Sequence, residues 1–178
     1  RLKFEKTLAS ELGLRFTDDD PVWSTARRTL ITGGVRAGKT TRGAFKAFKE
    51  ALNPQIKLIW LVGPDYMQAQ EEFRLIMEWC IQMKLITDPE KDISMPMNGQ
   101  RTLKTRLGCT IQTKSAKHPE TLASVAPDGV VLCEPGQMSD EVRDMLLGRA
   151  LERNAPILWG GTVENDDGHP TWAWYQEA

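Results

Sequence analysis

One segment of the sequence combines glycines, a lysine and a threonine at a spacing typical of phosphate binding. Residues 33–40 read GGVRAGKT and match the pattern G-x-x-x-x-G-K-[ST], between a predicted strand and a predicted helix. The glycines let backbone N–H groups converge on phosphate oxygens, and the start of the helix adds its positive dipole end. Lys39 can reach the β- and γ-phosphates, and Thr40 can ligate Mg²⁺. We therefore predict a site for ATP and Mg²⁺, contacted by Gly33, Gly34, Val35, Arg36, Ala37, Gly38, Lys39, Thr40 and Thr41.

Arg36 places a second cation inside this loop, beside Lys39. Fixed positive charge near the terminal phosphates stabilises the charge that redistributes during phosphoryl transfer. We therefore include Arg36 with Lys39 among the candidate catalytic residues. The alternative is an arginine that is merely solvated on the surface.

A candidate catalytic acid follows a hydrophobic strand near residue 130. ATPases of this kind commonly carry two adjacent acids at the carboxyl end of a strand beside the loop strand. Here Cys133 stands at the first position and Glu134 at the second. We expect Glu134 to orient or deprotonate the attacking water and to meet Mg²⁺ through water, with Thr40 as the direct ligand. A thiol suits softer metals, so Cys133 should contribute little. Slow hydrolysis, a site that depends on a neighbouring subunit, and a Glu134 that merely ends the strand remain alternatives.

Two further features could assist this chemistry. Thr162 follows Gly160-Gly161 at the end of another apolar strand, where its hydroxyl could sense the γ-phosphate and couple its loss to movement. Trp23, upstream of the loop, could approach the adenine or could pack in the core.

The elements that must position these residues alternate along the chain. Short apolar runs bounded by turn residues alternate with amphipathic segments, which predicts an α/β fold with a mainly parallel sheet and helices on both faces. A β-hairpin insertion is expected around Gly108. The predicted strands are 29–32, 57–62, 102–107, 110–114, 129–133 and 156–159, and the predicted helices are 39–52, 68–85 and 139–153.

Composition limits the remaining possibilities. The 178 residues suit one domain, 1–178, with residues 1–24 as a lead-in, and the net charge of −1 restricts any nucleic-acid contact to a local basic patch. No run is long enough to span a bilayer, and no signal-peptide core is present. The three cysteines and two histidines favour neither a disulfide framework nor a zinc site.

Residues 93–119 contain five basic side chains and no acidic one. Arg101, Lys104 and Arg106 could contact DNA phosphates without reading sequence, and Lys104 and Arg106 would face one side of a strand. Arg101 or Arg106 could instead act in trans, as an arginine finger on a neighbour's ATP. A solvated hairpin face is the simpler alternative.

The order of these motifs is similar to that of one family. The sequence resembles the ATPase domain of large-subunit terminases in five segments that follow in the family's order. They are the loop with its internal arginine, Pro64-Asp65-Tyr66-Met67-Gln68, the hairpin, the strand ending in Cys133-Glu134, and Leu158–Thr162. These are the DNA-packaging motors of tailed bacteriophages. The resemblance covers roughly residues 25–175. Cys133 departs from the aspartate that the family carries there.

The resemblance implies a three-layer P-loop NTPase of the RecA-like, ASCE type that hydrolyses ATP to drive double-stranded DNA into a procapsid. It implies a homo-oligomeric ring on the portal protein, a small terminase subunit as partner, and the cytoplasm of the infected bacterial host as location. Lys39 and Thr40 would hold nucleotide and Mg²⁺, Glu134 would be the catalytic acid, and Thr162 would couple hydrolysis to movement. Because the family's nuclease domain does not follow, we expect no nuclease activity, and the isolated domain could be a monomer.

Three other functions are compatible with the same residues. They are another P-loop translocase or helicase, a small-molecule kinase, and a nucleotide-binding module with little turnover. No arginine-rich lid follows the acidic strand, which disfavours the kinase.

Overall fold

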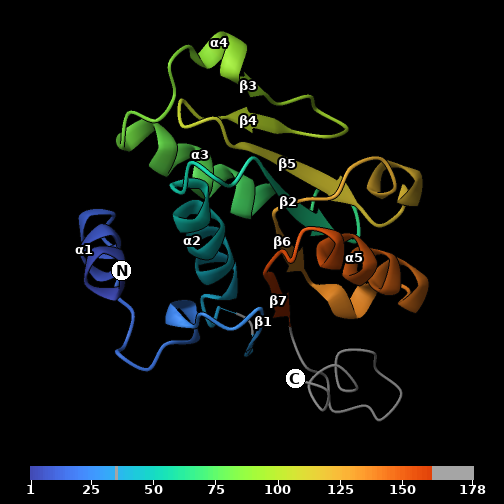
Figure 1. Cartoon of the computed structure of the whole chain (residues 1–178), viewed down its shortest axis with the longest axis horizontal. Coiled ribbons are helices and arrows are strands. Elements are labelled where there is room, and N and C mark those ends of the chain that lie inside the picture. Colours follow the sequence, from blue (N-terminus) through green and yellow to red (C-terminus); the bar gives the residue numbers. More distant parts are fainter. Residues whose placement is uncertain (35, 162–178) are drawn as a thin grey trace.

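The computed structural model describes residues 1–34 and 36–161 (Figure 1). Its helices are α1 (Leu2–Glu11), α2 (Lys39–Ala51), α3 (Gln70–Gln82), α4 (Pro89–Asp92) and α5 (Asp140–Glu152). Its strands are β1 (Arg28–Thr32), β2 (Leu58–Gly63), β3 (Ile93–Ser94), β4 (Thr102–Lys104), β5 (Thr110–Ser115), β6 (Gly129–Cys133) and β7 (Ile157–Gly161). Short 3₁₀ turns, η1 (Pro21–Trp23), η2 (Pro119–Leu122) and η3 (Pro135–Gln137), join some of them.

The described strands form one sheet in the order β1-β7-β6-β2-β5-β4-β3. The first five are parallel, and β4 and β3 continue the sheet antiparallel to β5 and β4. The carboxyl ends of the parallel strands therefore meet at one edge of the sheet. The expectation that the strand before Glu134 lies beside the loop strand is wrong, because β7 lies between β1 and β6.

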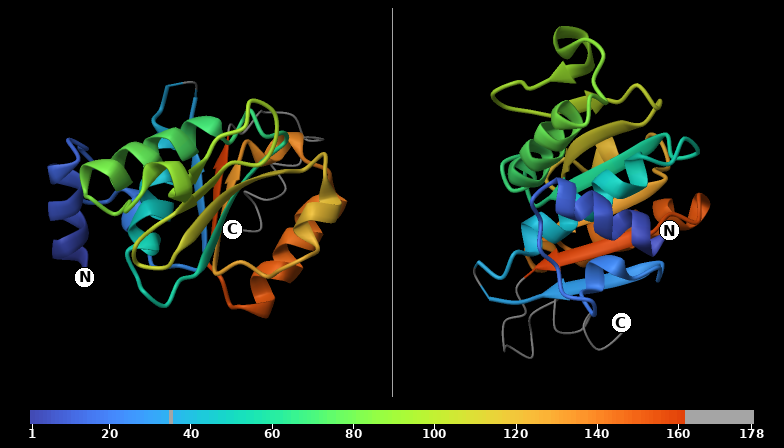
Figure 2. Two further views of the ribbon diagram at one scale, coloured as in Figure 1. Left: turned by 90° about the horizontal axis from the view of Figure 1, so that it is seen from above. Right: turned by 90° about the vertical axis from the view of Figure 1, so that its left-hand side faces the viewer.

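Helices cover both faces of this sheet, as the alternating pattern predicts. Figure 2 (left) shows α1, α2 and α3 on one side and α5 on the other. Alternation along the strands serves both layers, because successive side chains point to opposite faces. Ile59, Leu61 and Val131 join the core under α2 and α3, and Trp60 and Val130 join the core under α5.

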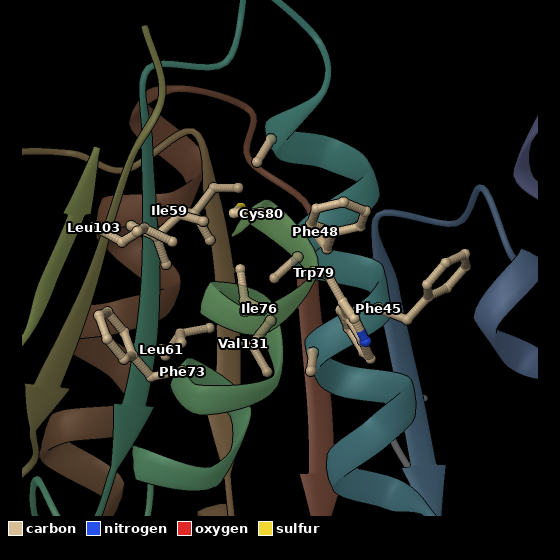
Figure 3. Close-up of a cluster of buried hydrophobic side chains, with 14 of the residues drawn as sticks. Phe45, Phe48, Ile59, Leu61, Phe73, Ile76, Trp79, Cys80, Leu103 and Val131 are labelled. Atoms are coloured by element: carbon tan, nitrogen blue, oxygen red, sulfur yellow. The ribbon is translucent and has the colours of Figure 1, made fainter. Parts of the chain in front are cut away.

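The larger core lies between the sheet and the helices α2 and α3 (Figure 3). Phe45 and Phe48 of α2 meet Trp79 of α3 edge-on, with ring centroids 6.2 and 5.7 Å apart. Trp23 packs edge-on against Phe45, and its indole N–H donates to the Thr17 carbonyl at 2.8 Å. Of the two roles considered for Trp23, the structure shows core packing.

The lead-in is tied to α2 by a buried ion pair. The Lys49 ammonium lies 2.9 Å from the Glu5 carboxylate and also donates to the Val22 carbonyl at 2.8 Å. This ion pair anchors α1 against the helix that follows the phosphate loop.

Three elements were not predicted from the sequence, and the first of them is α1, which lies in the lead-in. Asp88 accepts a hydrogen bond from the Glu90 N–H and caps the short α4, which Pro89 begins. Strand β3 then adds only two residues to the sheet. Elements this short are decided by pairing with β4 rather than by their own periodicity.

Candidate functional site

The phosphate loop connects the end of β1 to the first residue of α2, Lys39. Gly38 precedes the helix in the left-handed conformation, with φ of 75°, which glycine adopts without strain. The Ala37 N–H donates to the Gly34 carbonyl at 3.2 Å and closes the turn. A Cβ added to Gly33 would lie 2.8 Å from the Ala37 Cβ. The close turn therefore needs glycine at positions 33 and 38.

Lys39 is folded onto this loop. Its ammonium donates to the carbonyl oxygens of Gly33 at 2.8 Å and Gly34 at 3.1 Å. Thr40 and Thr41 occupy the first turn of α2 and are half-buried. The amine is thus held at the mouth of the loop, where anionic phosphate oxygens could replace the two carbonyls.

Arg36 lies in the loop with φ of 68° and is exposed. A left-handed conformation is uncommon for a residue with a side chain, and it costs on the order of 1 kcal/mol. Val35, beside it, lies outside the described residues.

Arg42 holds the loop from beneath. Its Nη2 lies 2.7 Å from Asp20 Oδ2, and its Nη1 donates to the Ala37 carbonyl at 2.8 Å. The guanidinium also lies over the Phe16 ring, 5.5 Å from its centroid. Sequence reasoning missed Arg42 and Asp20. The only signal was an acid before Pro21, which is typical of a helix cap.

Glu134 follows β6 at the edge of the sheet where the loop lies. It adopts the left-handed conformation with φ of 51°, and its N–H donates to the Gly160 carbonyl at 2.8 Å. Thr162, which would follow β7 at this edge, lies outside the described residues. The unusual backbone at Glu134 turns the chain sharply at a strand end, where functional groups are commonly held.

A small cavity joins the loop to the strand end. Its volume is about 50 Å³, and it is lined by residues of α2, α3, β6 and β7 together with Gln68 and Glu134. The polar or sulfur-bearing lining residues are Lys39, Thr40, Gln68, Glu72, Cys133 and Glu134. The structure therefore brings the predicted lysine, threonine and glutamate together at one place.

The segment after β2 supports this cavity. Asp65 Oδ1 accepts hydrogen bonds from the Met67 and Gln68 N–H groups. The Gln68 amide then donates to the Gln137 side chain at 2.8 Å, across to the turn after Glu134. This bridge links two of the segments on which the family resemblance depends.

Cys133 and Glu72 form a buried pair behind the cavity. Burial raises the pKa of the Cys133 thiol well above its ordinary value, so the sulfur is a neutral thiol at physiological pH. The thiol and the Glu72 carboxyl lie close enough for each to shift the pKa of the other. Burial also raises the pKa of Glu72, to about 7, despite the hydrogen bonds to its carboxyl. Sequence analysis missed Glu72, because nothing along the chain relates it to Cys133.

The basic residues of the hairpin do not form one patch. Arg101 lies beside Thr113, whose hydroxyl accepts from its N–H at 2.8 Å, near the carboxyl end of β5. Lys104 ends β4, and Arg106 lies in the turn before β5, where its N–H donates to the Leu85 carbonyl. Lys104 and Arg106 are exposed, but placing both on one strand was wrong, because β4 ends at Lys104.

The donors around the cavity fit a hard divalent cation. Mg²⁺ prefers oxygen ligands and keeps several waters, so one hydroxyl and a nearby carboxylate suffice beside nucleotide phosphates. Thr40 and Glu134 offer those groups, whereas the neutral Cys133 thiol does not. Within residues 1–34 and 36–161, no cluster of three or more His, Cys, Asp or Glu side chains could hold a metal without such a partner.

The order of the strands, the loop between β1 and α2 and the acid after β6 define a RecA-like P-loop NTPase fold. Solved structures similar to this chain include phage large terminases and the ATPase domain of one of them. The large terminase ATPase domain from Thermus phage P74-26 matches with a TM-score of 0.65 and 19% identity. The match covers 95% of this chain and 71% of the phage domain. The HK97 large terminase matches over 88% of this chain and 33% of its own, with a TM-score of 0.64 and 18% identity.

A third similar structure contains a nucleotide. The large terminase of a thermophilic bacteriophage in complex with ATP-γ-S matches over 87% of this chain and 36% of its own, with a TM-score of 0.53 and 13% identity. This chain thus spans about a third of the length of these two large-terminase chains. No protein-family model and no curated protein matches the sequence. At these identities the comparisons establish the terminase ATPase fold.

Helix length gives one further fact. None of the helices in the described part of the chain is long and apolar enough to cross a membrane.

Proposed function

We propose that this chain is the ATPase motor domain of a viral DNA-packaging terminase, which hydrolyses ATP to translocate double-stranded DNA into a procapsid. One observation carries the proposal: Lys39, Thr40 and Glu134 line a single cavity at the carboxyl edge of a terminase-like sheet. A phosphate-binding loop alone would fit many nucleotide-binding proteins. The acid across the cavity adds the group that hydrolysis requires.

The loop residues would perform the binding. Backbone N–H groups of the loop would bind the phosphates, and the Lys39 ammonium would exchange its two carbonyl partners for β- and γ-phosphate oxygens. Thr40 would ligate Mg²⁺, which when bound would neutralise charge on the phosphates. Arg36 can add positive charge near the γ-phosphate from its exposed position in the loop.

Glu134 would act on the attacking water. A carboxylate across the cavity from Lys39 can accept a proton from a water that is aligned with the γ-phosphate. The hydrogen bond from the Glu134 N–H to the Gly160 carbonyl holds the backbone of Glu134 against β7. Movement of β7 relative to β6 would therefore be felt at Glu134. Through this connection, loss of the phosphate could be coupled to movement, and Thr162, the next residue in the sequence after Gly161, would take part in the coupling.

The partners follow from the same proposal. They are double-stranded DNA, the portal protein, a small terminase subunit and further copies of this chain in a ring, in the cytoplasm of an infected bacterium. Arg101 lies towards the carboxyl edge of the sheet. It is therefore the better candidate, compared with Arg106, for an arginine finger that acts on a neighbour's ATP. Exposed Lys104 and Arg106 are left as candidate DNA contacts.

A nucleotide-binding module with little turnover is the second candidate. It is favoured by the neutral Cys133 thiol where a carboxylate would assist the metal. Single-turnover hydrolysis of radiolabelled ATP by the isolated chain separates the two, because a module would release intact ATP.

The experiment for the motor measures ATP hydrolysis with and without blunt double-stranded DNA, together with strand separation of a tailed duplex. A terminase motor should show hydrolysis that DNA stimulates and no strand separation. Unwinding would instead assign a helicase, and phosphoryl transfer to a small acceptor would assign a kinase. Failure to bind ATP at all would remove the proposal.

A further inference from the structure

Glu72 is a buried carboxyl group at the candidate site that the proposed reaction does not yet use. The residue is 7% exposed, and its Oε2 atom has no hydrogen-bond partner within the described residues. The carboxyl group interacts with the backbone of Glu72 itself and with the Cys133 thiol. Leaving a buried acceptor unpaired costs about 1–3 kcal/mol, and the large majority of such groups in native structures are paired. The free oxygen therefore points to a ligand.

The position of Glu72 directs it to the nucleotide. A Cβ added to Gly43 would lie 3.9 Å from Glu72 Cγ, so the side chain crosses α2 at Gly43. Gly43 lies four residues after Lys39 and three after Thr40, which places all three on one face of the helix. Glu72 also lines the same cavity as Lys39, Thr40 and Glu134. The carboxyl group thus stands one helical turn from the predicted metal ligand.

Cys133 explains why a carboxylate is needed from elsewhere. Strand β6 ends in a neutral thiol at the position where ATPases of this kind commonly carry an acid, and that thiol contacts Glu72. Two carboxylates in contact would repel each other, whereas a thiol donates a hydrogen bond and orients its partner. The pair therefore holds one carboxyl group, carried by α3 instead of β6.

We propose that Glu72 supplies the carboxylate that β6 lacks at position 133, and that it positions the hydrated divalent cation of a bound nucleotide. This inference rests on the proposed function, because it requires a nucleotide at the phosphate loop. Glu72 is a positioning residue that accepts hydrogen bonds from the water shell of the cation. Glu134 keeps its role toward the attacking water.

Binding of Mn²⁺ tests the proposal without hydrolysis. Mn²⁺ would be titrated into the full chain saturated with ADP and followed by electron paramagnetic resonance, with ADP affinity in EDTA measured separately by calorimetry. Glu72→Gln, which keeps the side-chain shape, should weaken Mn²⁺ binding about tenfold and leave ADP affinity in EDTA unchanged. Glu71→Gln is the matched control, because Glu71 is the exposed neighbour paired with Arg74.

Moving the carboxylate gives a second test. Cys133→Asp introduced into Glu72→Gln should restore Mn²⁺ affinity, because the acid then returns to β6. Glu72→Asp, which keeps the charge on a shorter side chain, should weaken Mn²⁺ binding less than Glu72→Gln does. The reverse order, or no restoration by Cys133→Asp, would contradict the proposal.

The outcomes separate the two levels of inference. If the wild-type chain binds neither ADP nor Mn²⁺·ADP, the proposed function fails. If the wild-type chain binds Mn²⁺·ADP and Glu72→Gln binds it equally well, only the assignment of Glu72 is overturned. Urea unfolding of each variant establishes that the folded chain is compared, and Glu72→Gln should be at least as stable as wild type, because a neutral amide replaces a buried acid.

Discussion

The carboxylate of Asp20 and the guanidinium of Arg42 form an ion pair across 22 positions of sequence, with Nη2 2.7 Å from Oδ2. The Asp20 side chain is 1% exposed, and it also accepts the Val22 N–H at 3.0 Å. Arg42 in turn holds the Ala37 carbonyl. One contact therefore fastens the segment before β1 to the loop after it, and the geometry of the phosphate site depends on residues on both sides.

Removing this contact should cost both stability and nucleotide affinity. Asp20→Ala leaves a partly buried guanidinium unpaired and should lower the free energy of unfolding by about 2–4 kcal/mol in urea titrations. Asp18→Ala is the control, because Asp18 is 94% exposed and pairs with Lys6 on the surface. Its effect should stay within about 0.5 kcal/mol. Equal losses in the two variants would mean that the buried pair has no special role.

Lys39→Ala should weaken ATP binding about 100-fold, because two charge-assisted hydrogen bonds to phosphate are lost. Calorimetry or equilibrium dialysis measures the change. Lys57→Ala removes an exposed lysine just before β2, at the opposite edge of the sheet, and should bind ATP as wild type does. ATP affinity that survives Lys39→Ala would remove the phosphate-loop assignment.

Glu134→Gln should retain ATP binding and slow single-turnover hydrolysis by about 10²- to 10⁴-fold, since the amide cannot accept a proton from water. Rapid-quench measurement of phosphate release checks the rate. Glu141→Gln is the matched control on the exposed first turn of α5. Hydrolysis at the wild-type rate in Glu134→Gln would show that another group prepares the water.

Alkaline pH should stabilise the fold through Lys46. Burial lowers the pKa of this 4%-exposed lysine from 10.5 to about 8. The positive charges of Lys49 and Arg1 lower the pKa further, whereas the carboxylates of Glu50 and Glu5 raise it. Between pH 8 and 10.5 the unfolded chain keeps a proton that the folded chain has released. The contribution of Lys46 to the free energy of unfolding therefore rises with pH across this window, on the order of 2 kcal/mol.

Urea unfolding at pH 8 and pH 10 measures this slope for the wild type and for Lys46→Met. The methionine keeps an apolar stem and removes the titrating amine, so the slope should be smaller in the variant. Exposed Lys3→Met should keep the wild-type slope. A Lys46→Met slope as steep as that of the wild type would assign the pH dependence to other groups.

The hairpin arginines should separate into two functions. Arg101→Glu should lower the ATPase rate of assembled rings at least tenfold, while rings mixed with wild-type subunits recover in proportion to the available fingers. Arg106→Glu should leave that rate near wild type and reduce the salt dependence of DNA binding by about one counterion. Identical effects of the two substitutions would contradict the separation that their positions in the hairpin indicate.

Local pattern was sufficient for much of this site. The spacing from Gly33 to Thr40 predicts a loop between a strand and a helix, because phosphate binding needs glycines and a lysine that are neighbours in sequence. Hydrophobic runs likewise located β2, β6 and β7 to within two residues at their ends. Glu134 could be placed at a strand end for the same reason.

Tertiary structure alone decided which residues complete the site. Strand order is set by pairing between distant segments, so only the folded sheet shows that β7 separates β1 from β6. Contacts between residues far apart in sequence likewise join Asp20 to Arg42 and Glu72 to Cys133. A sequence records covalent neighbours and local periodicity. The burial that leaves Glu72 Oε2 without a partner among the described residues exists only once the layers have packed.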